Sequence, residues 1–227
     1  FYPDHKLTPQ QISHIRFTAK LVVSATLENC APQETEHFLS ALLTHYQTRQ
    51  VEDQGAALAL TDTLSYLPLK RLTKPQAQQV ADFVLAQCQS RDPSLQAAAL
   101  QLFFRASQTL PPEHPLRAAV ARLRQEEHSF ALPSLRYRYA RVCGIPAEEA
   151  VGALSNQEVS DILLDNLKTA TPWMIKVVNV ELLSRYAACG RGSAMQIAAH
   201  FANIVRVSEA VVVRQRAGRA LLGIVPR

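Results

Sequence analysis

The residues best suited to chemistry in this 227-residue sequence lie in the stretch LRYRYAR, where arginines alternate with tyrosines. Its candidate binding residues are Arg136, Tyr137, Arg138, Tyr139 and Arg141. A guanidinium group matches the geometry of a phosphate, and a tyrosine ring can stack on an unpaired base, so the pattern is compatible with binding of single-stranded RNA. Arg138 and Arg141 are three positions apart, and we expect them to share one face of a helix.

Two further groups of arginines could extend such a basic strip. They are Arg214, Arg216 and Arg219 near the end of the chain, and Arg117, Arg122 and Arg124 before the tyrosine-rich stretch. Arginines beside an apolar stripe also commonly extend their charged ends into water or pair with neighbouring acids. The sequence favours this second interpretation, a solvated or protein-binding face, over a nucleic-acid site.

The positive charge is concentrated in the second half of the chain. The formal net charge is +5, with an isoelectric point near 9.2. Residues 1–100 hold 8 Lys or Arg against 9 Asp or Glu, whereas residues 101–227 hold 16 against 10. Such a basic half could meet phosphates or an acidic protein surface, because both are attracted by the same field.

Motifs that would indicate catalysis or cofactor binding are missing from the sequence. It has no GxxxxGK[ST], HExxH or GxSxG pattern. Gly190 and Gly192 form a GxG without a third glycine, and a predicted helix precedes them, so we interpret them as a helix end and linker. His37 and His45 are too far apart in sequence for adjacent-turn metal ligation, and His200 lies on an apolar helix. We therefore expect no catalytic, cofactor-binding or metal site, and no enzyme activity.

The cysteines are too widely spaced for a zinc motif or a dense disulfide framework. They are Cys30, Cys88, Cys143 and Cys189, of which the closest two are 46 positions apart. Free thiols in mostly apolar helices are the simplest interpretation. We expect an intracellular, reducing compartment, either the cytoplasm or the mitochondrial matrix, and the sequence does not distinguish the two.

Almost every segment carries the pattern of a capped amphipathic helix. Thr8, Asp92 and Ser155 precede predicted helices as N-caps, Ser155 with Glu158 in a capping box, and Gly144 follows a predicted helix as its C-cap. This predicts an all-α protein of about twelve helices. No apolar run approaches the roughly 18–20 residues that span a bilayer, so we expect no membrane insertion. The sequence begins at Phe1 without a methionine, and we expect it to be a processed or trimmed fragment.

The helix pattern recurs with a period of about 40 residues. A shift of 40 places "PSLQAAALQLFF" on "PSLRYRYARVCG", with Pro93, Ser94 and Leu95 over Pro133, Ser134 and Leu135. Helix starts near residues 9–13, 53, 93, 133, 172 and 212 predict six helical hairpins. A period near 40 is typical of stacked helix pairs, each completing the core of its neighbour. We expect one domain over residues 1–227, a right-handed α-solenoid of about six antiparallel hairpins, with an irregular helix bundle as the alternative.

These segments allow a resemblance to a known repeat family. "DPSLQAAALQL" resembles the first helix of a HEAT-type repeat, and "VVVRQRAGRALLGIV" is similar, with its Val-Arg and Ala-Leu order. The resemblance to HEAT and armadillo repeats covers two or three of the six units. The unit at residues 133–144 departs from it, because Arg136 to Tyr139 stand where small residues are expected. The layout is also similar to organellar RNA-binding repeats of about 35–40 residues.

The predicted function is a non-enzymatic helical-repeat scaffold that binds a protein partner within a larger assembly. The alternative is an RNA-binding repeat protein of the organellar RNA-processing type, which would use the basic surface of residues 101–227. The sequence implies no cofactor, and it identifies neither the partner nor the oligomeric state.

Overall fold

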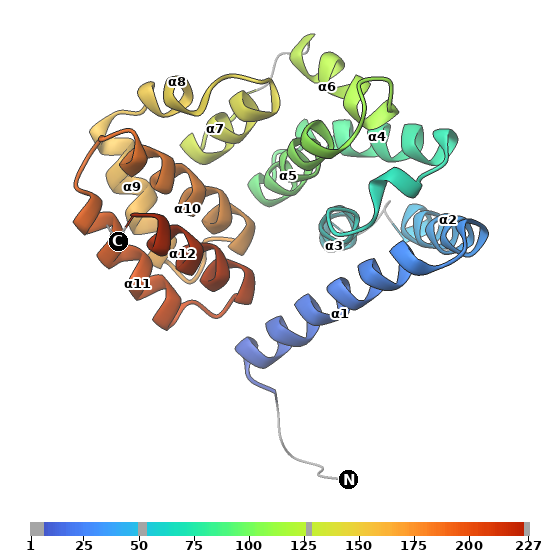
Figure 1. The fold of residues 1–227 in the computed structure, drawn as a ribbon, viewed down its shortest axis with the longest axis horizontal. Helices are drawn as coiled ribbons and strands as arrows, with labels where there is room; N and C mark the ends of the chain where they lie inside the picture. Colours follow the sequence, from blue (N-terminus) through green and yellow to red (C-terminus); the bar gives the residue numbers. More distant parts are fainter. Residues whose placement is uncertain (1–6, 50–53, 126–128, 225–227) are drawn as a thin grey trace. The chain divides into compact units, whose positions relative to one another are not determined.

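The computed structural model describes residues 7–49, 54–125 and 129–224, which form twelve α-helices and one 3₁₀ helix (Figure 1). These residues include no β-strand, so the predicted all-α class and the predicted number of helices are confirmed. No helix in the described part of the chain is both long enough and apolar enough to cross a membrane.

The helices follow one another with short connections. The first six are α1 (Pro9–Asn29), α2 (Pro32–Arg49), α3 (Gln54–Leu64), α4 (Lys74–Cys88), α5 (Pro93–Thr109) and α6 (Pro115–Gln125), with the 3₁₀ helix η1 (Leu69–Arg71) between α3 and α4. The other six are α7 (Pro133–Val142), α8 (Ala147–Gly152), α9 (Asn156–Leu167), α10 (Trp173–Ala188), α11 (Ala194–Val207) and α12 (Val211–Ile224).

Local side-chain chemistry sets many of the helix ends. The Asp92 carboxylate accepts a hydrogen bond from the Ser94 amide at 2.8 Å and so caps α5, as predicted. Ser155 and Glu158 form the predicted capping box of α9. Gly144, after α7, has a φ of 84°, a left-handed conformation that glycine adopts with little strain.

The helices are grouped into two compact units. The central unit spans Leu21–Pro146, and the C-terminal unit contains the chain from Ala147 onward together with the residues up to Lys20. The boundary therefore falls inside α1 and again just before α8. A single domain over residues 1–227 stays a prediction.

Helix α5 is the centre of the central unit. It packs against α3 and α7 as well as against its chain neighbours α4 and α6, and α4 packs against α6. Every residue from Ser94 to Leu100 is buried. Its run of small residues, Ala97 to Ala99, allows neighbouring helices to approach closely, because protein interiors pack to the density of organic crystals.

Helix α10 has the same role in the C-terminal unit. It packs against α8, α9, α11 and α12, and nine of its sixteen residues are buried. In this unit α9 also contacts α11, so the α9–α10 pair packs against the α11–α12 pair. The sequence VVV at residues 211–213, which favours a strand in isolation, starts helix α12 because it continues the buried side of that helix through Val211 and Val213.

Six of the helices begin at intervals of 38 to 45 residues. The starts of α1, α3, α5, α7, α10 and α12 are Pro9, Gln54, Pro93, Pro133, Trp173 and Val211. Within the central unit, α3, α5 and α7 of this series touch in turn, and within the C-terminal unit α10 touches α12.

Arginine side chains link helices that are far apart in sequence. The guanidinium of Arg105 on α5 donates to the carbonyl oxygen of Ser65, 40 residues earlier, just after α3 ends. Arg71 of η1 donates to the carbonyl oxygen of Cys30, 41 residues earlier, just after the end of α1. The last carbonyl groups of a helix have no partner within it, so these arginines satisfy acceptors that would otherwise need water.

Replacement of Arg105 by methionine tests the contribution of this link to stability. Arg105→Met keeps the apolar stem but removes the donor, and we expect the free energy of unfolding to fall by about 1–3 kcal/mol. The matched control is Arg91→Met at an exposed connecting position, for which we expect a change within about 0.5 kcal/mol. Denaturation by urea, followed by circular dichroism, measures both. Equal effects of the two substitutions would contradict a structural role for Arg105.

Candidate functional site

The tyrosine- and arginine-rich stretch forms helix α7, and the structure turns several of its side chains inward. Arg138 is only 1% exposed, among the most buried large side chains described. Its guanidinium carbon lies 4.5 Å from the centre of the Phe104 ring of α5, in a cation–π contact. Arg138 and Arg141 therefore do not form a shared exposed face, and Arg138 is not available to a phosphate in this arrangement.

The two tyrosines of the stretch are also packed within the central unit. Tyr137 is buried. The ring of Tyr139 lies 5.2 Å from that of Phe130, and its hydroxyl lies 3.5 Å from the Leu123 carbonyl oxygen. Burial, followed by interaction with the Cys143 thiol, raises the pKa of Tyr139. These surroundings are those of packed core-edge rings rather than of an open stacking platform.

Four of the other candidate arginines bind carbonyl oxygens at or shortly after helix C-termini. Arg141 donates to Ile145 at 2.6 Å and Arg124 donates to Cys143, both just after α7. Arg117 donates to Leu110, the C-cap of α5, at 2.7 Å, and Arg214 donates to Ser208, the C-cap of α11, at 2.6 Å. A cation at this end of a helix also interacts favourably with the negative end of the helix dipole.

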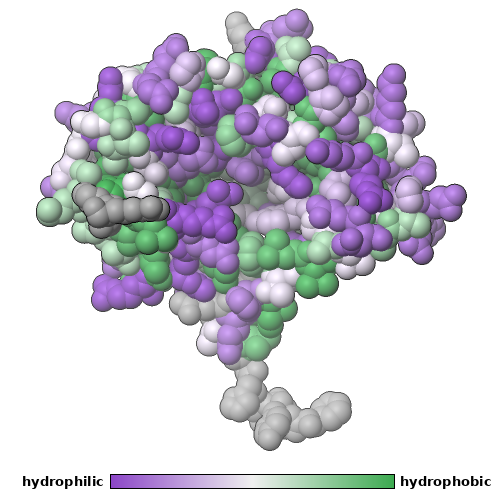
Figure 2. Space-filling model, in the orientation of Figure 1, coloured by the Kyte–Doolittle hydropathy of each residue, from purple (hydrophilic) through white to green (hydrophobic). Residues whose placement is uncertain are grey.

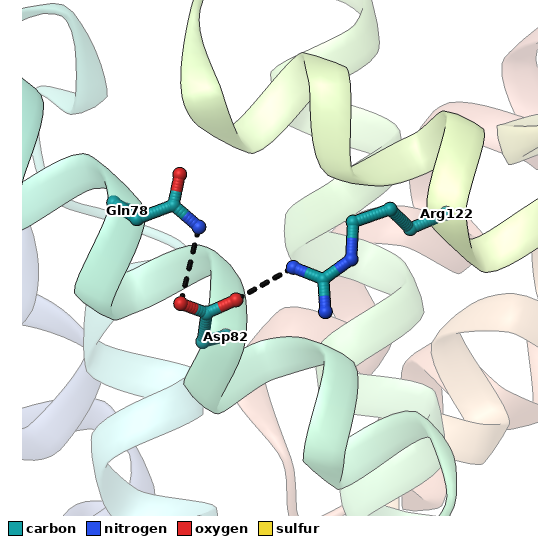
Figure 3. A network of polar contacts seen from close by, with 3 residues as sticks. All are labelled: Gln78, Asp82 and Arg122. Atoms are coloured by element: carbon teal, nitrogen blue, oxygen red, sulfur yellow. Dashed lines mark hydrogen bonds and ion pairs between the residues drawn. The ribbon is translucent and has the colours of Figure 1, made fainter.

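Arg122 takes part in a polar network on the surface of α4 and α6 (Figure 3). Its guanidinium lies 2.7 Å from the Asp82 carboxylate, which also accepts a hydrogen bond from the Gln78 amide at 3.1 Å. Gln78 and then Arg122 lower the pKa of Asp82. Both members of the ion pair are about half exposed, so solvent screens it and it contributes roughly 0–1 kcal/mol.

Three of the eight candidate residues remain on the surface. They are Arg136 on α7 and Arg216 and Arg219 on α12, all exposed. Arg136 belongs to the central unit and the other two to the C-terminal unit. The sequence analysis did not predict that Arg141 and Arg214 donate to backbone carbonyl oxygens, because the acceptors lie in connections whose course the sequence does not specify.

Metal-binding side chains do not cluster among the described residues, and the two glycines of the GxG sequence follow the end of a helix. Among the described residues, no group of three or more His, Cys, Asp or Glu side chains is placed to hold a metal ion. Gly190 and Gly192 have φ angles of 68° and 72° after the end of α10, which confirms their interpretation as a helix end and linker. A side chain at position 192 would meet the Tyr186 ring at 2.8 Å, so close packing also requires glycine there.

A buried polar pair lies between α9 and α11 in the C-terminal unit. The Asn166 amide nitrogen lies 3.3 Å from Nε2 of His200, and Asn166 is buried. Burial lowers the pKa of His200 below its ordinary value of about 6.5. In this orientation the Asn166 amide nitrogen donates and Nε2 accepts, so this hydrogen bond requires Nε2 to carry no proton.

The surface in view in Figure 2 is mostly hydrophilic, with hydrophobic residues among the polar ones. No protein-family model, curated protein or solved structure matches the chain.

Alanine substitutions at a buried and an exposed arginine separate a structural role from a surface role. Arg138→Ala leaves a cavity against Phe104, and we expect it to lower the free energy of unfolding by roughly 2–5 kcal/mol. Arg91→Ala, at an exposed connecting position, should change it by less than about 0.5 kcal/mol. Urea denaturation provides the comparison. A small effect of Arg138→Ala would show that the buried packing of this side chain is wrong.

The protonation of His200 predicts a pH dependence of stability. Because its pKa is lower in the folded state, the unfolded chain binds more protons as the pH falls through about 6.5, and stability then decreases. We expect the free energy of unfolding to fall between about pH 7.5 and pH 5.5, with a shallower fall in His200→Gln, which keeps an acceptor for Asn166. His114, whose pKa burial also lowers, is present in both proteins. Identical pH profiles would contradict the role assigned to His200.

Proposed function

We propose that the protein is a non-enzymatic helical-repeat scaffold, an α-solenoid of about six hairpins of HEAT or armadillo type that binds a protein partner in a larger assembly. The proposal rests on one observation, the regular sequence separation of the polar contacts between neighbouring helix pairs. The separation is close to the period at which the helices themselves begin.

These polar contacts occur in both compact units. In the central unit, Gln76 donates to the Glu36 carbonyl oxygen at 3.1 Å, and Arg122 pairs with Asp82, each across 40 residues. In the C-terminal unit, Arg191 donates to the Gly152 carbonyl oxygen at 3.2 Å across 39 residues. Contacts between matching positions of successive units are what stacked repeats produce, since each repeat touches mainly its neighbours.

The placement of the arginines supports a protein partner over RNA. Arg138 is buried, and Arg117, Arg124, Arg141 and Arg214 donate to carbonyl oxygens within the fold. A strip that binds a nucleic-acid backbone needs several cations aimed outward along one path. The exposed arginines Arg136, Arg216 and Arg219 are what supports the RNA-binding alternative.

A salt titration distinguishes the two functions. RNA binding predicts that the affinity for fluorescein-labelled single-stranded RNA, measured by anisotropy, falls steeply as salt rises. It also predicts weaker binding by Arg136→Glu/Arg216→Glu/Arg219→Glu than by the control Arg91→Glu/Arg185→Glu, which alters two other exposed arginines. For a protein scaffold we expect neither effect, and recovery of a stoichiometric protein partner from nuclease-treated native extract. Salt-dependent RNA binding, with capture only of nuclease-sensitive material, would overturn the scaffold proposal.

A further inference from the structure

Helix α1 exposes a continuous row of aliphatic side chains. The spacing of three, four and three positions places the row within an arc of about 80° on one side of the helix. Its members are Ile12, Ile15, Ala19 and Val22. All four are exposed, Ile15 by 52% and Val22 by 58%. We call these four residues the α1 apolar stripe.

The covered side of α1 is more polar than the stripe. It follows the same spacing and consists of Phe17, Lys20, Ser24 and Leu27, of which Leu27 is buried and the other three are half-buried. Burial, followed by the charge of Arg16, lowers the pKa of Lys20 to about 8. A helix that only completes a core buries its more apolar side. Because α1 does the reverse, its stripe marks an interaction surface.

Other exposed leucines lie among charges of both signs. Leu164 and Leu167 on α9 are 58% and 47% exposed, and Asp165 between them is paired with Lys168 at 2.7 Å. Such a mixture does not select the charge of a partner. The surroundings of the stripe are of one sign, because residues 7–27 contain one arginine, one lysine and no Asp or Glu.

The exposed charge beside the stripe is that of Arg16. It directly follows Ile15 and is itself exposed. The spacing of the stripe is that of the a and d positions of a coiled coil, in which Arg16 takes an e position. Residues at e positions pair with charges on the partner helix. A carboxylate on a helix packed against the stripe would therefore pair with Arg16.

A second copy of the chain does not supply this carboxylate. In a pair of α1 helices with their stripes side by side, in either direction, the residues facing Arg16 come from residues 12–22 of the other copy, and none of these is acidic. An anionic bilayer is also a poor match. Helices that lie on membranes are rich in Lys and Arg on their polar face, whereas Arg16 is the one arginine of α1 and Lys20 is half-buried on the covered side.

We propose that the α1 apolar stripe docks an acidic amphipathic helix of a protein partner, whose aliphatic side chains cover the stripe and whose Asp or Glu pairs with Arg16. The proposal rests on the scaffold function and specifies the chemistry of the partner. The stripe is only about 15 Å long, so one short helix covers it, and we expect a dissociation constant on the order of 10 µM.

Two synthetic helical peptides serve as probes. Each is fluorescein-labelled and has about four heptads with leucine at a and d, and one carries glutamate and the other lysine at e and g. We expect the acidic peptide to bind with an anisotropy change at about 10 µM and the basic peptide to bind at least about tenfold more weakly.

Substitutions on α1 test the position of the docked helix. Ile12→Gln/Ile15→Gln should weaken binding of the acidic peptide at least about tenfold, because it removes aliphatic contacts without changing charge. The matched control is Leu21→Gln, on the same helix and 46% exposed but outside the stripe, and it should bind as the wild type does. Circular dichroism verifies that each variant is folded.

Charge reversal tests the role of Arg16. Arg16→Glu should reverse the preference, so that the basic peptide binds more tightly than the acidic one. The control Arg91→Glu makes the same change in net charge at an exposed connecting position, and it should keep the preference of the wild type.

Several outcomes would overturn the proposal. They are equal binding of the two peptides, no binding up to about 200 µM, and an Ile12→Gln/Ile15→Gln variant that binds like the wild type. Self-association of the wild type in sedimentation velocity, or retention on phosphatidylserine vesicles, would also do so if the same variant abolished it, because the stripe would then have another occupant.

Capture from nuclease-treated native extract separates this proposal from the scaffold function. If the wild type and Ile12→Gln/Ile15→Gln recover the same stoichiometric partner equally well, the docking site is wrong and the scaffold function stands. If the wild type recovers no protein and binds RNA in a salt-dependent manner, the scaffold function itself is wrong, and the docking proposal fails with it.

Discussion

The unsatisfied carbonyl groups at helix C-termini are the constraint on which much of this structure depends. Twelve α-helices within the described residues leave many such acceptors, and a helix cannot satisfy its own last carbonyls. Arginine side chains reach several of these ends. Some act locally, as Arg141 does just after α7, and others act between helices, as Arg105 does at the end of α3. The second kind connects neighbouring helix pairs as well as satisfying a carbonyl.

This constraint accounts for a compositional feature that otherwise suggests nucleic-acid binding. The chain has 18 arginines and 6 lysines. A planar guanidinium presents several donors in a fixed geometry, so it can bind a carbonyl oxygen while its stem packs against apolar side chains. Many of the arginines are directed at the backbone of the protein itself, and the positive net charge is consequently a weaker indicator of an external polyanion than the sequence alone suggests.

Helix α7 and its neighbour α5 fill the core with side chains of different size. Its neighbour α5 is buried through alanines, whereas α7 presents Tyr137 and Arg138 at corresponding depth. The Phe104 ring of α5 provides the face on which the Arg138 guanidinium lies, so the larger side chain has a complementary surface. The stretch that was predicted as a binding site therefore mainly packs against the core, and Arg136 remains on the surface.

The sequence by itself determined the helices, their ends and their spacing, because these depend on neighbouring residues. Asp92, Ser155 and Gly144 act within one turn of their own position, and a period near 40 can be counted along the chain. Only the tertiary structure decided where the long side chains go. Whether an arginine faces water, a ring or a carbonyl depends on what lies within reach of its flexible stem, and for Arg105 and Arg138 that partner comes from a different helix. Likewise, the exposure of Leu164 and Leu167 follows from which side of α9 its neighbours cover, which helical periodicity alone does not specify.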